Sequence, residues 1–216
     1  MNDRVVITGL GLVCAIGNNA DECFDNALEG KVGIKEVKSV EHSACYAHIG
    51  GENNAFVTPE GEDRASALCI KAAEEAVSDS GLNVSADPDR VSVVVGSCVG
   101  GAVSIEKFYR DYVADPAKAK GEDVLKMPIS AIANNVALKF GAQGAVDNVA
   151  NACAAGTMSI SIAADLIRSG KADAVIAGGS DPMSSLAFSG FHALHALDSE
   201  PCRPFNKSKG IALGEG

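Results

Sequence analysis

A cysteine stands between an expected strand and an expected helix, a common place for a nucleophile. Residues 146–150 predict a strand and residues 154–169 a helix, with Cys153 between them. The positive end of the helix dipole and the unpaired N–H groups of the first turn stabilise a thiolate there. Small neighbours leave room for a substrate carbonyl, and the Cys153 N–H is available to hold an oxyanion. The alternative is a buried structural cysteine, and from the residues alone the two interpretations are about equal.

Two glycine-rich turns each offer a different chemistry. Cys98 lies in the turn at residues 96–101, but glycines at 100 and 101 weaken the helix start that would activate its thiol. A close approach of backbone or ligand is therefore favoured there over a nucleophile. Residues 9–11 follow an expected strand, yet Cys14 occupies the third glycine position of a dinucleotide fingerprint. The sequence favours a structural turn there over nucleotide binding.

The four histidines offer a possible metal site. His192 and His195 are three residues apart, which places them on one face of an expected helix. No carboxylate or cysteine stands at ligand spacing beside them. We interpret them as surface or packing residues, and we give His42 and His48 in a weakly patterned loop the same interpretation. The sequence thus predicts no metal and no cofactor.

The elements around these residues alternate between strands and helices. Expected strands cover residues 5–9, 91–96, 146–150, 174–177 and 211–213. Expected helices cover residues 21–28, 63–80, 103–113, a segment from Pro128, 154–169 and 186–197, and a loop with a small hairpin fills residues 31–60. This alternation predicts one α/β domain with a mainly parallel sheet.

The composition excludes several classes of protein. The 216 residues carry 28 acidic and 18 basic side chains, a net charge of −10 that argues against nucleic-acid binding. No apolar run approaches the roughly 18–20 residues of a membrane span, and no signal peptide is recognisable. Seven cysteines without a CxxC pair predict free thiols in a reducing cytoplasm.

Residues 151–157, Asn-Ala-Cys-Ala-Ala-Gly-Thr, resemble the active-site stretch of β-ketoacyl-[acyl-carrier-protein] synthases. These are elongating condensing enzymes with the thiolase-like fold. Further stretches resemble the family in the same order, at residues 5–11, 63–82, 96–101, 176–181, 190–191 and 203–216. The resemblance therefore extends along essentially the whole chain.

The resemblance implies an acyltransferase of fatty acid or polyketide synthesis that performs a decarboxylative Claisen condensation. By this analogy Cys153 takes the acyl group, Val99 and Gly100 border the acyl pocket, and Phe205 packs against Cys153. Acyl- and malonyl-loaded carrier protein would be the partners of a homodimer. The expected fold is a thiolase-like layered α/β fold, with a mostly parallel mixed sheet, helices on both faces, and a buried central helix after Cys153.

The resemblance places residues 1–216 in the N-terminal domain of the family, about half of such an enzyme. The histidines and lysine that assist the reaction in this family belong to the second half, so we expect this chain alone to be inactive in condensation, while slow acylation of Cys153 stays open because the helix terminus is local. Asn206 stands where the family usually has aspartate, and Ile211 replaces an aromatic residue. The presence of Cys153 argues against the related chain-length-factor subunits, which lack it. A non-catalytic scaffold module and a thiolase-type acyltransferase, with its nucleophile in another segment, remain as alternatives.

The basic residues of this acidic chain bear on the carrier protein, which is itself acidic. Arg203, Lys207 and Lys209 form the densest basic group near the end of the chain. The resemblance makes them candidates for carrier-protein docking. Arg64 and Lys71 share an expected helix, where ordinary solvated charge is slightly favoured over a docking role.

Overall fold

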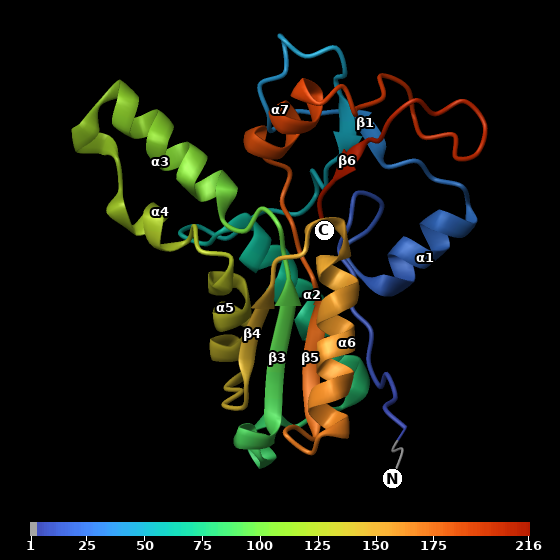
Figure 1. The fold of residues 1–216 in the computed structure, drawn as a ribbon, viewed down its shortest axis with the longest axis vertical. Helices are drawn as coiled ribbons and strands as arrows, with labels where there is room; N and C mark the ends of the chain where they lie inside the picture. Colours follow the sequence, from blue (N-terminus) through green and yellow to red (C-terminus); the bar gives the residue numbers. More distant parts are fainter. Residues whose placement is uncertain (1–3) are drawn as a thin grey trace.

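The computed structural model describes residues 4–216 and is built around a parallel sheet. Its three strands, in spatial order, are β4 (Val146–Val149), β3 (Val91–Gly96) and β5 (Ala174–Gly179) (Figure 1). Gly96 at the end of β3 pairs with Val149 on one side and with Gly179 on the other. The carboxyl ends of all three strands therefore meet at one edge of the sheet.

Helices cover both faces of this sheet. Val91, Val93 and Val95 of β3 enter one core with α2 (Arg64–Ser80) and α5 (Ser130–Phe140). The intervening residues of β3 face the other way, since side chains alternate along a strand, and α6 (Ala155–Arg168) contacts all three strands there. This confirms the predicted α/β fold with a mainly parallel sheet and helices on both faces.

Local signals fix the ends of the helices that the sequence predicts. The Asp63 side chain accepts a hydrogen bond from the Ser66 N–H at the start of α2, and Gly81 closes the helix with a φ of 65°. Asn19 caps α1 (Ala20–Leu28) in the same way, by accepting from the Glu22 N–H. Both helices begin and end within one residue or so of the predicted bounds.

A second, smaller sheet lies beyond the carboxyl edge of the first. Strand β1 (Ile34–Glu36) pairs antiparallel with β2 (Ile49–Gly51), which confirms the predicted hairpin, and β2 pairs parallel with β6 (Leu213–Gly214). Helix α7 (Ser185–Ala193) packs here through Phe188, which is completely buried. The parallel sheet and the mixed sheet thus meet around the segments that follow β3, β4 and β5.

The remaining elements are short, apart from one helical projection. Helix α3 (Ala102–Ala114), which the sequence predicts, and α4 (Gly121–Leu125), which it does not, extend to one side of the sheet (Figure 1). Single turns of 3-10 helix are η1 (Val84–Ala86), η2 (Pro88–Arg90), η3 (Pro116–Lys118) and η4 (Ala152–Ala154).

The predicted strand at residues 5–9 is wrong. The segment lies along α2, where the Leu10 N–H donates to Asp79 Oδ2 at 2.9 Å, and the side chains of Val6 and Ile7 are 67% and 75% exposed. No strand pairs with residues 5–9 within the described part of the chain. The β-branched run suits a strand, but a strand forms only where a ladder partner is present.

The predicted burial of the helix after Cys153 is also corrected. Only one stripe of α6 is buried, formed by Ala155, Ser159 and Ala163 against the sheet, while Met158 and Ile160 are exposed. Within residues 4–216, the helix is thus covered on one side. Four predicted bounds also shift by two residues or more: β5 ends at Gly179, α5 begins at Ser130, α7 ends at Ala193, and β6 begins at Leu213.

Candidate active site

Cys153 lies at the carboxyl edge of the parallel sheet, in the turn between β4 and α6. It is the middle residue of η4, so it lies in a 3-10 turn, and Ala154 alone stands between it and the α-helix that the sequence predicts to follow at once. The preceding residue, Ala152, has a φ of 45°, a left-handed conformation that costs free energy for a residue with a Cβ. Cys153 itself is exposed. A strained turn thus presents an accessible thiol immediately before a helix N-terminus.

Glycines let the first turn of α6 approach the sheet closely. A Cβ on Gly96 would lie 2.3 Å from the carbonyl carbon of Ala155, and one on Gly179 would lie 3.0 Å from the Gly156 Cα. The Ser159 hydroxyl adds a polar link, since it lies 2.6 Å from the Gly178 carbonyl oxygen of β5. The position of the turn that carries Cys153 therefore depends on backbone contacts with β3 and β5.

The turn after β3 is held in place by one carboxylate. Asp181 Oδ1 accepts hydrogen bonds from the Ser97 hydroxyl at 2.7 Å and from the Cys98 and Val99 N–H groups at 2.9 Å each. The Ser97 hydroxyl in turn accepts from the Gly100 N–H at 3.0 Å. Sequence reasoning missed Asp181. The available signal was its place directly after β5, at the edge where the glycine turn also lies.

The structure places the predicted pocket residues on this turn. Val99 is half-buried, and Gly100 is buried with a φ of 55°. Partial desolvation raises the pKa of the Cys98 thiol, and negative charge on Asp181 and on Cys153 raises it further. Cys98 is therefore close enough to Cys153 to feel its charge, but its own thiolate is disfavoured.

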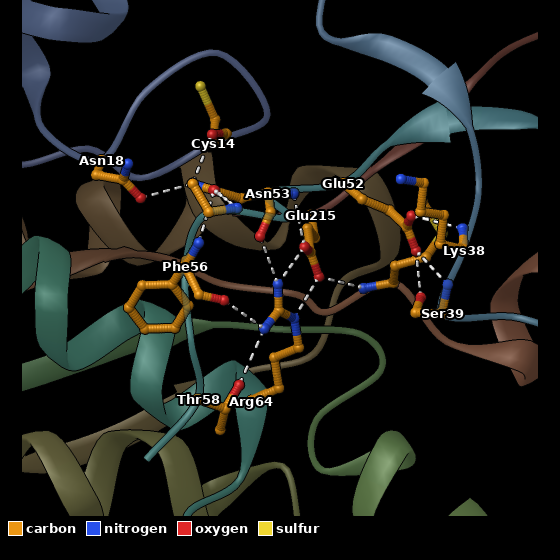
Figure 2. Close-up of polar contacts among 12 residues, drawn as sticks. Cys14, Asn18, Lys38, Ser39, Glu52, Asn53, Phe56, Thr58, Arg64 and Glu215 are labelled. Carbon is orange, nitrogen blue, oxygen red and sulfur yellow. Dashed lines mark hydrogen bonds and ion pairs between the residues drawn. The ribbon is translucent and has the colours of Figure 1, made fainter.

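A buried ion pair fixes the segment next to Asp181. The Asp181 N–H donates to the Gly216 carbonyl at 3.0 Å, and the Gly216 N–H donates to the Asp181 carbonyl at 3.1 Å. The neighbouring Glu215 carboxylate receives two hydrogen bonds from Arg64, at 2.7 Å from Nε and 2.5 Å from Nη2 (Figure 2). The Glu215 side chain is 1% exposed and that of Arg64 20%.

The Arg64 guanidinium and the Glu215 carboxylate form further hydrogen bonds with the segment between β2 and α2. Arg64 Nη1 donates to Thr58 Oγ1 and Nη2 to the Asn53 carbonyl, while the Asn53 N–H donates to Glu215 Oε1 (Figure 2). Hydrogen bonding to Glu215 raises the pKa of Arg64 further. Arg64 is therefore a structural cation rather than the solvated charge that the sequence suggests, whereas Lys71 is exposed as expected.

The predicted docking residues lie in an exposed loop. Arg203 pairs with Glu200, while Lys207 and Lys209 form no ion pair with the rest of residues 4–216. Phe205, at a φ of 60°, is fully exposed in the same loop, so the expectation that it packs against Cys153 is wrong here. An exposed ring has no burial to hold it on the thiol.

The other candidates separate into packing and surface roles. His192 and His195 both contact the Tyr46 ring, with centroids 4.9 Å and 5.8 Å away. The residues from 4 to 216 contain no disulfide and no group of three side chains able to hold a metal ion. Over the same residues, no helix is long and apolar enough to cross a membrane.

Comparison with known proteins gives one consistent family. A model of the β-ketoacyl synthase N-terminal domain matches residues 2–216. The chain is 33% identical over 232 residues to 3-oxoacyl-[acyl-carrier-protein] synthase 2 of Staphylococcus aureus (strain COL), covering 100% of this chain and 56% of that protein. It is 34% identical over 229 residues to nodulation protein E of Rhizobium sp. (strain N33), with the same two coverages.

Solved structures agree with this likeness. The ishigamide ketosynthase/chain length factor superimposes with a TM-score of 0.90 at 27% identity, over 98% of this chain and 56% of that one. A type II PKS acyl-carrier protein in complex with its ketosynthase bound to the hexaketide gives a TM-score of 0.87 at 29% identity, over 100% of this chain and 57% of the other. The chain thus spans about half the length of the relatives it matches.

Proposed function

The chain belongs to the β-ketoacyl synthase family and has the thiolase-like layered α/β fold of its ketosynthases. From this premise we propose that it provides the acyl-accepting nucleophile of a condensing enzyme. Cys153 is that nucleophile. The observation that carries the proposal is the exposed Cys153 thiol, which follows the strained Ala152 at the edge of the sheet and precedes the N-terminus of α6.

The proposed reaction has two stages. The Cys153 thiolate first attacks the carbonyl carbon of an acyl-carrier-protein thioester; a new carbon–sulfur bond forms, the bond to the carrier sulfur breaks, and the carrier thiolate takes up a proton. Malonyl-carrier protein then loses carbon dioxide, and its carbanion attacks the acyl group on Cys153. The Cys153 thiolate leaves, and the product is a β-ketoacyl thioester longer by two carbons.

The neighbouring residues suit the binding of an acyl chain. Val99 and Gly100 border the proposed acyl pocket on the turn that Asp181 fixes, so the wall beside the thiol is rigid. The raised pKa of Cys98 disfavours its thiolate, which argues against Cys98 as the nucleophile. Phe205 lies outside this wall, and its exposed ring is available to contact incoming substrate.

The proposed partner is an acyl-carrier protein. One similar structure is described as a ketosynthase in complex with its acyl-carrier protein, and the exposed Lys207 and Lys209 offer positive charge to an acidic partner. Arg203 belongs to the same docking loop, although Glu200 offsets its charge. Fatty acid or polyketide synthesis is the proposed setting, and a homodimer the proposed assembly.

We expect acylation of Cys153 by acyl-carrier protein, detected as a mass increase of one acyl group on the peptide that contains it. Cys153→Ala should abolish the increase, because the carbon–sulfur bond then has no acceptor. Cys98→Ala is the matched control and should still be acylated. Acylation at Cys98 instead would favour a thiolase-type acyltransferase, whereas no acylation of folded wild-type chain would favour a non-catalytic scaffold.

The docking loop allows a second test. Lys207→Glu combined with Lys209→Glu should raise the KM for acyl-carrier protein in the acylation of Cys153 by about tenfold and leave kcat nearly unchanged, since rim charges act mainly on association. Lys31→Glu combined with Lys171→Glu makes the same change in net charge at exposed sites elsewhere. An unchanged KM in the first variant, or an equal rise in both, would remove the loop as the docking site.

A further inference from the structure

Two histidine rings outside the proposed active site face each other through their Nδ1 atoms. His42 Nδ1 lies 2.9 Å from His48 Nδ1, and the ring centroids are 4.9 Å apart. His42 comes from the loop that joins β1 to β2, and His48 immediately precedes β2. The fold therefore brings together a pair that the spacing in the sequence does not single out.

The remaining nitrogen of His42 sets its tautomer. His42 Nε2 lies 2.8 Å from the Val37 carbonyl oxygen, which only accepts hydrogen bonds, so Nε2 carries the proton. In the neutral ring, the lone pair of Nδ1 then points toward His48. A ring N–H donated to a backbone carbonyl, with the other nitrogen free to bind, is the arrangement that orients metal-binding histidines.

The backbone around the pair is held by the smaller sheet and its core. The Val37 N–H donates to the His48 carbonyl at 2.9 Å, and the Cys45 N–H donates to the His42 carbonyl at 2.9 Å. The His42 ring also packs near Phe188, with centroids 6.2 Å apart. The His42 ring is thus placed by fixed contacts, while the exposed His48 side chain can adjust its rotamer.

The surroundings favour a cation. Both rings line an open cavity of about 450 Å³, and its charged residues are Glu36, Glu41 and Lys38. The two carboxylates outnumber the single ammonium, so a divalent ion between the rings would lie beside a net negative charge.

We propose that His42 and His48 bind one divalent transition-metal ion of the Zn²⁺ and Cu²⁺ class through their Nδ1 atoms. The proton that His48 Nδ1 donates to His42 Nδ1 in the free protein then moves through solvent to His48 Nε2, so that each ring binds as a neutral imidazole. Zinc–nitrogen bonds of about 2.0–2.1 Å in tetrahedral geometry separate two nitrogens by about 3.3 Å. The rings must therefore move apart by about half an ångström. No third His, Cys, Asp or Glu joins the pair within residues 4–216. Water completes the coordination, and the expected dissociation constant is micromolar.

Calorimetric titration of untagged protein tests this site, which does not depend on the proposed function. We expect one Zn²⁺ per chain, tighter binding of Cu²⁺ in the order usual for imidazole ligands, and no binding of Mg²⁺. Zn²⁺ should also raise the melting temperature, reversibly on addition of a chelator. His48→Gln should weaken Zn²⁺ binding at least tenfold and remove the rise in melting temperature.

Two matched variants locate the metal. His195→Gln removes an exposed histidine that stacks on Tyr46 and should leave Zn²⁺ binding unchanged. The Cys14 and Cys23 sulfurs are 3.4 Å apart and are a second pair of side chains that could bind Zn²⁺. Cys14→Ser removes one of these thiols and should also leave Zn²⁺ binding unchanged. Absence of Zn²⁺ binding by the wild type, unchanged affinity in folded His48→Gln, or loss of affinity in either control would overturn the proposal.

Discussion

Replacing Arg64 with alanine should lower the free energy of unfolding by about 3–5 kcal/mol, the usual cost of removing one partner from a buried ion pair. The cost arises because the Glu215 carboxylate, 1% exposed, would lose the guanidinium that compensates it and both hydrogen bonds from Arg64. Chemical denaturation of wild type and variant, with equal m-values, gives the difference directly.

An exposed ion pair in the same chain provides the control. Arg90 pairs with Asp173 through two hydrogen bonds, but the two side chains are 35% and 69% exposed. Arg90→Ala should therefore cost much less than Arg64→Ala, because exposed ion pairs contribute little to stability. If Arg64→Ala costs no more than Arg90→Ala, the pair with Glu215 does not stabilise the fold as argued.

Loss of the Arg64 side chain should also affect the proposed active site. Glu215 precedes Gly216, whose backbone pairs with Asp181, and Asp181 holds the N–H groups of Cys98 and Val99. A looser Glu215 therefore loosens the wall beside Cys153. We expect Arg64→Ala to slow acylation of Cys153 even at temperatures where the variant remains folded.

Replacing Gly96 with alanine should be among the most damaging single changes to the active site. The added Cβ would lie 2.3 Å from both the carbonyl carbon and the oxygen of Ala155 and 2.6 Å from the Gly156 nitrogen. These are backbone atoms at the start of α6, so they cannot rotate away as a side chain can. Overpacking of this kind costs about 3 kcal/mol or more, and the displaced helix should reduce acylation of Cys153 at least tenfold.

Gly178 is the matched control for this substitution. It also lies in a strand of the parallel sheet, but a Cβ there would meet nothing within 4 Å. Gly178→Ala should change the free energy of unfolding by less than about 1 kcal/mol and leave acylation intact. Thermal unfolding and the acylation rate measure both effects, and equal losses in the two variants would contradict the contact argument.

The elements that the sequence predicts well carry their information locally. Helix α2 has an apolar face at helical spacing, Asp63 as its N-cap and Gly81 as its C-terminal stop, all within twenty residues. Strand β3 is apolar at almost every position and is buried throughout. By contrast, residues 5–9 have the composition of a strand without a partner in the described sheets, and composition alone does not reveal that.

The residues of the candidate site show the same difference between local signals and contacts with distant segments. Cys153, Val99 and Gly100 stand in recognisable local patterns, and the fold places all three on turns at the carboxyl edge of one sheet. Asp181 also stands in a family-like stretch, but its hydrogen bonds to the turn after β3 join residues more than 80 positions apart, so the stretch alone does not reveal its role. Phe205 matches a family stretch, yet its ring is exposed, because no packing partner reaches its loop.

By itself, the sequence determined the alternation of strands and helices that builds the parallel sheet, the α/β class, and the place of Cys153 between β4 and α6. These depend on caps, periodicity and short runs, in which interacting residues are neighbours along the chain. Only the tertiary structure decided which segments pair as strands, which charged side chains are buried, and which distant side chains contact one another. The Arg64–Glu215 contact joins residues 151 positions apart, and the Nδ1 contact of His42 and His48 depends on the loop between β1 and β2. Such contacts come from packing between distant segments, and a pattern read along the chain does not contain them.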